Sequence, residues 1–300
     1  MKRTKILTLG ATGMLGHTLL GYLSKRPEFE LHATARSRSA FLGGCDPALA
    51  ARVSFNVDAG NPDQILNCLC SFRPDLVINC IGIIKQLPAA QDPVSCITVN
   101  ALFPHTLAKL CQLAGARLLH ISTDCVFSGE QGNYRESDPS DAADLYGRSK
   151  FLGEVAYPHC ITLRTSIIGH ELGSSLGLVD WFLAQEGSVK GYTRAIFTGF
   201  PTVELARIIA DFVVPNRELS GLYQVSSEPI SKFELLQLVA KSYGKEIQIE
   251  PDAAFHCDRS LNSEAFRQAT GYQPPSWPEL VAQMHQDFSN GNPREGGQGR

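Results

Sequence analysis

Residues 146–150 combine the side chains best suited to acid–base chemistry. Their sequence is Tyr-Gly-Arg-Ser-Lys, so a phenol and an ammonium stand four residues apart. On a helix this spacing places Tyr146 and Lys150 on one face. A nearby ammonium favours the phenolate and lowers the pKa of a tyrosine toward neutral pH. We therefore expect Tyr146 to protonate a carbonyl oxygen or to accept a proton from an alcohol.

Two hydroxyl groups stand at the end of a strand-like run, in the sequence His-Ile-Ser-Thr-Asp-Cys-Val-Phe at residues 120–127. Ser122 and Thr123 would lie at the carboxyl end of the fifth sheet strand, where ligands bind in open α/β sheets. Either hydroxyl could hydrogen-bond the oxygen that Tyr146 protonates. The alternative is that these hydroxyls only cap the end of the strand.

A glycine-rich turn, Gly-Ala-Thr-Gly-Met-Leu-Gly at residues 10–16, joins an apolar run to a helical pattern. Such a turn directs backbone N–H groups and the positive end of a helix to one point, which suits a pyrophosphate. Glycine is needed because a Cβ would block the turn and the approach of phosphate oxygens. The spacing is GxxGxxG, and it predicts a dinucleotide site.

The end of the second strand indicates which dinucleotide is preferred. NAD enzymes place Asp or Glu there to bind the ribose hydroxyls. Here the sequence is Ala-Thr-Ala-Arg-Ser-Arg at residues 33–38, without an acid. Arg36 could hold a 2′-phosphate and stack on adenine. We expect NADP(H) to be preferred and NAD(H) to be accepted, unless Arg36 is only a solvated surface residue.

Elements that would position these groups alternate along the first half of the chain. Strand-like runs occupy residues 5–10, 30–36, 53–57, 76–82, 117–123 and 160–168. Helical patterns occupy residues 14–25, 62–72, 93–114 and 145–156. This order predicts an α/β fold with a doubly wound parallel (Rossmann) sheet.

Beyond about residue 168 the pattern changes and predicts a smaller C-terminal lobe that binds substrate. Helical patterns there occupy residues 178–185, 203–214 and 232–243. The expected division is a dinucleotide-binding domain at 1–168 with the chain returning at about 196–226, a lobe at 169–195 and 227–288, and a disordered tail at 289–300. The tail has no apolar residue.

Composition excludes several classes of function. The net charge is −3 with 19% charged residues, so a broad basic surface for nucleic acid is not expected. No apolar run approaches the roughly 20 residues that span a bilayer, and no signal peptide is seen, so we expect no membrane partner and a cytoplasmic location. The nine cysteines include no CxxC pair, which favours reduced, apolar thiols over metal sites or disulfides.

In their order along the chain, these motifs resemble those of the extended short-chain dehydrogenases/reductases, and within them the dTDP-4-dehydrorhamnose reductase group of nucleotide-sugar reductases. The sequence STDCVFSG at residues 122–129 is similar to the group's STDYVFDG, although Cys125 replaces an aromatic residue. Further similar segments are residues 10–16, 134–138, 146–154 and 163–166. The resemblance is closest over residues 5–170 and weaker toward residue 279.

The resemblance implies that Thr123, Tyr146 and Lys150 are the catalytic residues, with Thr123 chosen over Ser122 because it stands four residues before Phe127. It also places Asp58 beside the adenine and Asn79 to Gly82 along the cofactor's ribose. The implied cofactor-binding residues are Gly10, Thr12, Gly13, Met14, Leu15, Gly16, Arg36, Asp58, Cys80, Ile81, Gly82, Asn100, Tyr146 and Lys150.

The implied reaction is hydride transfer from a nicotinamide to carbon 4 of a 6-deoxy-hexulose attached to a nucleotide diphosphate. Tyr146 would protonate the carbonyl oxygen, Lys150 would hold the ribose and lower the pKa of Tyr146, and Thr123 would orient the carbonyl. In the lobe, Lys190, Arg194 and Arg259 are the candidates for binding the diphosphate. The expected partners are a nucleotide-diphosphate sugar and a second copy of the chain in a homodimer.

Other activities use the same scaffold. Dehydratases carry an Asp-Glu pair after the hydroxyl residue, and Asp124-Cys125 lacks the second carboxylate. An epimerase that retains NAD remains an alternative, although Arg36 argues against it. A non-catalytic NADP-binding regulatory subunit is the other alternative, and the presence of both Tyr146 and Lys150 argues against that.

Overall fold

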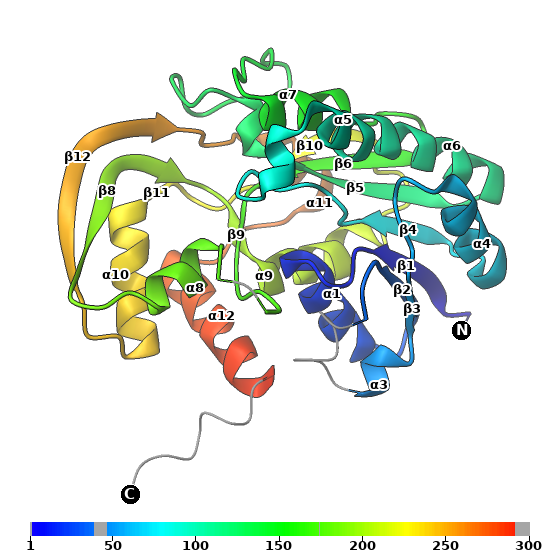
Figure 1. Ribbon diagram of the computed structural model, residues 1–300, viewed down its shortest axis with the longest axis horizontal. Helices are drawn as coiled ribbons and strands as arrows, with labels where there is room; N and C mark the ends of the chain where they lie inside the picture. Colours follow the sequence, from blue (N-terminus) through cyan, green and yellow to red (C-terminus); the bar gives the residue numbers. More distant parts are fainter. Residues whose placement is uncertain (1, 39–46, 174, 292–300) are drawn as a thin grey trace, which may run out of the picture.

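A seven-stranded parallel sheet forms the larger part of the protein (Figure 1). The computed structural model describes residues 2–38, 47–173 and 175–291. The strands lie in the order β10-β6-β5-β4-β1-β2-β3, and every neighbouring pair is parallel. Their bounds are β1 (Thr4–Leu9), β2 (Phe29–Ala35), β3 (Val53–Phe55), β4 (Leu76–Asn79), β5 (Arg117–Thr123), β6 (Cys160–Thr165) and β10 (Gly221–Gln224). The order confirms the predicted Rossmann sheet.

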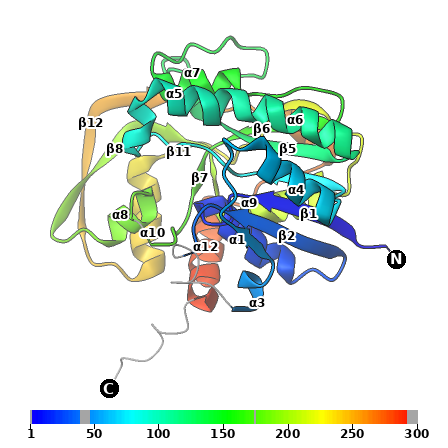
Figure 2. The same ribbon diagram turned by 45° about the vertical axis from the view of Figure 1, so that its right-hand side comes forward.

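Helices cover both faces of this sheet, as expected of parallel strands (Figures 1 and 2). On one face, Leu69 of α4 and Leu107 of α6 pack with Leu7 of β1. On the other, Leu19 of α1 and Leu205 of α9 pack with the neighbouring Ile6. The helix bounds are α1 (Met14–Ser24), α3 (Pro47–Ala50), α4 (Pro62–Phe72), α6 (Phe103–Ala114), α7 (Leu145–Leu152) and α9 (Thr202–Ile208). Successive side chains of β1 point to opposite faces of the sheet, and both faces are covered, so successive residues of β1 are apolar.

The helix expected over residues 93–114 is interrupted. It consists of α5 (Pro93–Cys96), a π-helical segment η2 (Ile97–Leu102) and α6, which ends at Gly115 with φ +69°. A second π-helical segment, η4 (Ile209–Val213), follows α9. Such segments accommodate one extra residue in a helical turn and often lie near functional sites. The apolar periodicity of the sequence did not reveal this change.

The second lobe contains a three-stranded sheet in the order β11-β8-β12, seen at the left of Figure 1. The strands β8 (Ser188–Phe197) and β12 (Gln248–Asp258) are parallel, and β11 (Ile230–Ser231) is antiparallel to β8. Its helices are α8 (Leu178–Leu183), α10 (Lys232–Tyr243) and α12 (Trp277–Gly291), and α11 (Glu264–Thr270) lies against β10. A capping box of Ser231 and Glu234 starts α10, and Gly244 ends it.

Several expected boundaries differ from the structure. The run at 160–168 splits into β6 and β7 (Ile167–Ile168), and β7 pairs with β9 (Phe200–Pro201). Helix α12 continues to Gly291, beyond the start of the expected tail, and residues 292–300 lie outside the described residues. Within the described part of the chain, no helix combines the length and apolarity needed to cross a membrane.

Candidate active site

A cavity of about 680 Å³ lies at the carboxyl ends of the sheet strands. The sheet side contributes residues 12–15 after β1, residues 80–87 after β4 and residues 121–125 at the end of β5. The lobe side contributes residues 195–197 of β8 together with Lys232, Phe255, Cys257 and Arg259. A cavity of this size between a parallel sheet and a second lobe is a typical place for a cofactor and a small substrate.

The glycine turn forms one wall of this cavity. Gly10 has φ +88°, a conformation that favours glycine. A Cβ on Gly16 would lie 2.1 Å from the carbonyl oxygen of Gly10, so α1 can begin this close to the turn only with glycine there. Because Thr12 to Leu15 line the cavity, the N-terminus of α1 faces it. This cradle fits a pyrophosphate.

Thr123, Tyr146 and Lys150 are brought together in the same cavity. Thr123 ends β5, whereas Tyr146 and Lys150 lie on α7, which begins where Asp144 accepts a hydrogen bond of 2.7 Å from the Gly147 N–H. The hydroxyl of Thr123 lies close enough to Tyr146 to lower the pKa of its phenol. The ammonium of Lys150 donates to the carbonyl oxygen of Ile121 at 2.8 Å. The hydroxyl, the phenol and the ammonium that the sequence indicated are therefore neighbours.

The acidity of Tyr146 differs from the expectation. Burial raises the pKa of Tyr146 above its ordinary value, and the nearby Cys125, Asp124 and Asp144 raise it further. The hydroxyl of Thr123 lowers this pKa, but by less than burial raises it, so burial outweighs the hydroxyl of Thr123 in setting this pKa. The phenol is therefore protonated at neutral pH, as a proton donor must be.

Lys150 is the group whose charge is sensitive to pH in this site. Burial lowers the pKa of Lys150 to about 8, and the carboxylate of Glu154 and the thiol of Cys80 partly offset this. Glu154 accepts two hydrogen bonds from Arg164 and one of 2.7 Å from the hydroxyl of Ser122. Thr123 is engaged as well, because its hydroxyl donates to the Asp124 carboxylate at 3.2 Å and accepts from the Cys125 N–H at 3.1 Å.

The residues predicted to bind the cofactor divide into two groups. Cys80, Ile81 and Gly82 line the cavity, as do the central residues of the glycine turn. Asn100 is buried and does not line it. Its side chain accepts from the N–H of Ile83 at 2.8 Å and donates to the Ile83 carbonyl at 3.1 Å. Asn100 therefore fixes the segment after β4 instead of facing the cavity.

Arg36 and Asp58 lie outside the cavity lining, at the ends of neighbouring strands. Arg36 is exposed and directly follows β2, whose Thr34 carbonyl accepts from the N–H groups of Gly10 and Ala11. Asp58 follows β3 and accepts from the N–H of Gly60 at 2.7 Å. Both residues therefore stand at the same edge of the sheet as the glycine turn.

The three basic residues predicted for the lobe do not share one place. Lys190 and Arg194 are exposed on β8, and neither lines the cavity; Lys190 instead pairs with Asp252 at 3.1 Å. Both fall outside because their side chains alternate with those of the buried β8 residues. Arg259 does line the cavity, where its Nε donates to the Phe127 carbonyl at 2.8 Å.

Lys232 is a cavity-lining cation that the sequence analysis missed. It is the first residue of α10, directly after the capping residue Ser231. The capping box could have drawn attention to it, because the start of a helix is a common place for binding an anion. Lys232 and Arg259 both lower the pKa of Asp124, which burial raises. The lobe end of the cavity therefore carries two cations near one carboxyl group.

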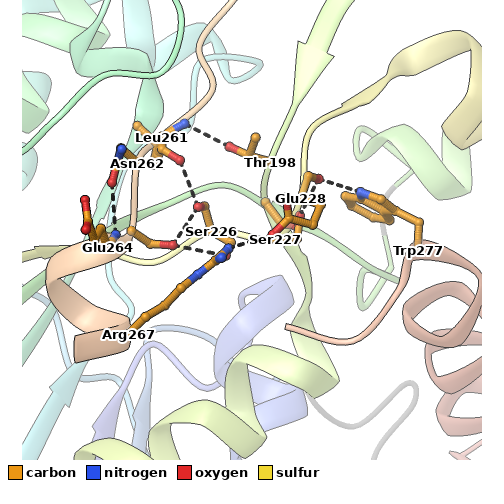
Figure 3. A network of polar contacts seen from close by, with 11 residues as sticks. Thr198, Ser226, Ser227, Glu228, Leu261, Asn262, Glu264, Arg267 and Trp277 are labelled. Atoms are coloured by element: carbon orange, nitrogen blue, oxygen red, sulfur yellow. Dashed lines mark hydrogen bonds and ion pairs between the residues drawn. The ribbon is translucent and has the colours of Figure 1, made fainter. Parts of the chain in front are cut away.

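The segment that carries Arg259 is held by the polar network of Figure 3. The N–H of Leu261 donates to the Thr198 hydroxyl at 3.1 Å, and the Leu261 carbonyl accepts from Ser226 at 2.9 Å. On the other side of Arg259, the N–H of Asp258 donates to the Gly129 carbonyl at 2.7 Å. These bonds connect the lobe to segments from the sheet domain and fix Arg259 at the cavity.

The fold and the cavity together define a Rossmann-type protein with a dinucleotide cradle, a hydroxyl–phenol–ammonium cluster and two cations, Lys232 and Arg259, on the lobe side of the cavity. The chain belongs to the RmlD substrate binding domain family, which matches residues 4–290.

Similar proteins include reductases and a subunit of a methionine adenosyltransferase. The chain is 28% identical over 236 residues to a dTDP-4-dehydrorhamnose reductase of Aggregatibacter actinomycetemcomitans, covering 75% of this chain and 74% of the relative. It is 25% identical over 252 residues to methionine adenosyltransferase 2 subunit beta of Danio rerio, covering 80% and 74%. A solved structure with the same fold is a dTDP-4-dehydrorhamnose reductase of Bacillus anthracis in complex with NADP, with a TM-score of 0.78 and 22% identity over 96% of this chain and 99% of that one.

Proposed function

We propose that this protein is an NADP(H)-dependent reductase of a nucleotide-linked 4-keto-6-deoxy sugar. The observation that carries the proposal is the convergence of Thr123, Tyr146 and Lys150 with the glycine turn on one cavity. Membership of the RmlD substrate binding domain family and similarity to dTDP-4-dehydrorhamnose reductases support it.

The residues present fit a dinucleotide. The cradle of Gly10, Gly13 and Gly16 would hold the pyrophosphate, since a Cβ on Gly16 would close it. Arg36 would bind the 2′-phosphate from its exposed position after β2, and Asp58 would lie beside the adenine. NADP(H) is therefore the preferred cofactor, with NAD(H) as a weaker substitute.

The cofactor supplies the hydride when it is bound, and the chain supplies the proton. Tyr146 remains protonated because burial raises its pKa, so it can donate to the sugar's carbonyl oxygen. The Thr123 hydroxyl orients the same oxygen. Lys150 binds the ribose hydroxyls and, when charged, stabilises the phenolate left on Tyr146. With its pKa near 8, Lys150 carries this charge at neutral pH.

The substrate's diphosphate would bind at the lobe end of the cavity, near Arg259 and Lys232. Phe255 and Phe197 line the same end and offer apolar area to a nucleoside. Binding energy from this remote part of the substrate would position the sugar carbonyl against Tyr146. The geometry supports Arg259 over Lys190 and Arg194 for this role.

Calorimetric titration of UDP, dTDP and GDP into the NADPH-loaded protein tests the substrate class. We expect at least one of the three to bind, and a matching 4-keto sugar nucleotide to be reduced while NADPH absorbance falls. Binding of none at millimolar concentration, together with reduction of simple ketones, would contradict the proposal.

A regulatory subunit is the second candidate, supported by the similarity to methionine adenosyltransferase 2 subunit beta. An epimerase is a further alternative on the same scaffold. The presence of the whole Thr123, Tyr146 and Lys150 cluster favours a catalyst over a binding subunit. An epimerase would change the sugar without net oxidation of NADPH, and a regulatory subunit would turn over no sugar nucleotide.

A homodimer is the proposed assembly, through the face formed by α5, η2 and α7. Four large apolar side chains on these segments are exposed: Val94 at 73%, Ile97 at 51%, Leu102 at 59% and Leu152 at 61%. Exposed apolar patches of this kind often mark protein–protein interfaces. In a two-fold dimer through this face, these side chains would pack against the same face of the second copy. Analytical ultracentrifugation should give a dimer for the wild type and a monomer for Leu102→Asp.

The proposed location is the cytoplasm. The eight cysteines within the described residues are free thiols, as proteins of reducing compartments usually have. Fractionation of cells that express a tagged chain would test this.

A further inference from the structure

Three partly buried residues, Asp180, His170 and Tyr243, form a row of hydrogen bonds outside the residues that the proposed reaction uses. The Nδ1 of His170 is hydrogen-bonded to the Asp180 carboxylate, and its Nε2 lies 2.9 Å from the Tyr243 hydroxyl. Since the carboxylate can only accept, Nδ1 donates. Burial raises the pKa of Tyr243, and Asp180 and Asp287 raise it further, so its hydroxyl remains a donor.

These three residues connect separate elements of the lobe. His170 follows β7, Asp180 lies in α8, and Tyr243 is the last residue of α10. Phe288 of α12 stacks on the His170 ring with centroids 3.7 Å apart. His170 and Asp180 expose only 14% and 16% of their side chains. The imidazole is therefore fixed from three helices.

The same hydrogen-bonded residues hold one wall of the cavity in place. The second oxygen of Asp180 accepts from the Glu171 N–H at 2.8 Å. The Glu171 carboxylate in turn accepts from the N–H groups of Leu176 and Gly177 at 2.8 and 3.1 Å. Residues 171, 172 and 176–178 all line the cavity. His170 and Asp180 thus determine where this stretch of backbone lies.

This wall contacts the glycine turn across the cavity. A Cβ built on Gly177 would lie 2.7 Å from the Cε of Met14, the first residue of α1. The end of the Met14 side chain therefore reaches the backbone of Gly177. A cofactor bound at the cradle would lie next to this contact.

We propose that His170 is a positioning residue for cofactor binding. Through Asp180 and Tyr243 it holds the wall against the start of α1, so that the wall is ordered before the dinucleotide binds. This inference rests on the proposed dinucleotide site. A wall that must be ordered on binding costs conformational entropy, which appears as weaker affinity. The chemical step is unaffected, because Thr123, Tyr146 and Lys150 are held by β5 and α7.

The test compares Tyr243→Phe, His170→Asn and the double variant. Phenylalanine removes only the hydroxyl, and asparagine keeps a donor toward Asp180 but loses the bond to Tyr243. Each should raise the Kd for NADPH about three- to tenfold, the effect of one lost hydrogen bond, with kcat at saturating NADPH within about twofold of wild type. In the His170→Asn background, Tyr243→Phe should have no further effect, because both remove the same bond.

The matched control is His285→Asn. His285 packs against the Tyr243 ring with centroids 4.3 Å apart, whereas the Tyr243 hydroxyl is hydrogen-bonded to His170. It should leave the Kd for NADPH unchanged. Unchanged Kd in all variants, additive effects of the two substitutions, or a fall in kcat at unchanged Kd would overturn the inference. A wild-type protein that fails to bind NADPH would instead refute the proposed function.

Discussion

Arg164 and Glu154 form an ion pair joined by two hydrogen bonds, with Nε and Nη2 each 2.7 Å from a carboxylate oxygen. Their side chains are 2% and 9% exposed. The pair holds the Glu154 carboxylate four residues after Lys150, beyond the end of α7, and this charge raises the pKa of the Lys150 ammonium. A structural ion pair thereby tunes the charge of a proposed catalytic residue.

Glu154→Gln should shift the pH dependence of turnover. Removing the carboxylate charge lowers the pKa of Lys150 below its value of about 8, so the ammonium is lost at lower pH. The alkaline limb of kcat/KM should move to lower pH, with activity near pH 6 less affected. A pH–rate profile measures this. An unshifted limb would show that Glu154 does not act on Lys150.

Lys150→Met should stabilise the folded protein at neutral pH while abolishing turnover. In the wild type, the pKa of Lys150 is lower in the folded state, about 8, than its ordinary value near 10.5. Between these two pH values the unfolded wild-type chain binds more protons than the folded one, so the free energy of unfolding of the wild type rises with pH. Below pH 8 the buried charge costs roughly 3 kcal/mol. Urea unfolding should show this gain at pH 7 and its decline toward pH 10. A gain that is equal at both pH values would contradict the stated cause.

Tyr146→Phe should reduce turnover by about 100- to 10,000-fold, the usual effect of losing a positioned proton donor. NADPH affinity should change little, because phenylalanine keeps the ring. Steady-state kinetics and a fluorescence titration measure the two quantities. Tyr157→Phe, on an exposed residue, is the control. A Tyr146 variant with half the wild-type rate would remove this phenol from the mechanism.

Arg36→Ala should reduce the preference for NADPH over NADH. Arg36 is exposed after β2, so its removal should leave the fold intact. The ratio of kcat/KM for the two cofactors measures the effect. The control is Arg38→Ala, since the Arg38 guanidinium lies over the Phe55 ring at 5.4 Å. If the wild type already uses NADH better, the assignment of Arg36 is wrong.

Arg259→Ala should weaken binding of the nucleoside diphosphate about 10- to 100-fold, as expected for a lost hydrogen bond to a charged group. Lys190→Ala is the control, because Lys190 is exposed and pairs with Asp252. Calorimetric titration at two salt concentrations measures both. Equal losses in the two variants would favour a diffuse electrostatic effect over a specific contact at Arg259.

Short sequence motifs predicted those parts of the site that a single segment of the chain forms. The glycine turn, the hydroxyl at the end of β5 and the Tyr146–Lys150 spacing each follow from a short motif. Burial was not visible in these motifs. The sequence therefore suggested that Lys150 would lower the pKa of Tyr146, whereas burial raises this pKa, and the Lys150 ammonium donates to the Ile121 carbonyl oxygen.

The lobe was less predictable because its contacts join distant segments. The pairing of β8 with β12 brings together residues about 60 apart in sequence, and neither run was identified as a strand. For the same reason the cavity-lining Lys232 was overlooked while the exposed Lys190 was chosen. The π-helical segment η2 was also missed, since one extra residue hardly changes an apolar stripe over 20 residues.

The pairing of β10 with β6 has a consequence for how the protein can be divided. The chain leaves the sheet after β6, builds β8 and α9, and returns to complete the sheet edge at residues 221–224. A fragment that stops at residue 168 would present the unpaired backbone of β6 as a long apolar edge, which is prone to join other chains. We therefore expect the dinucleotide-binding half to need residues 221–224 at its sheet edge to stay soluble.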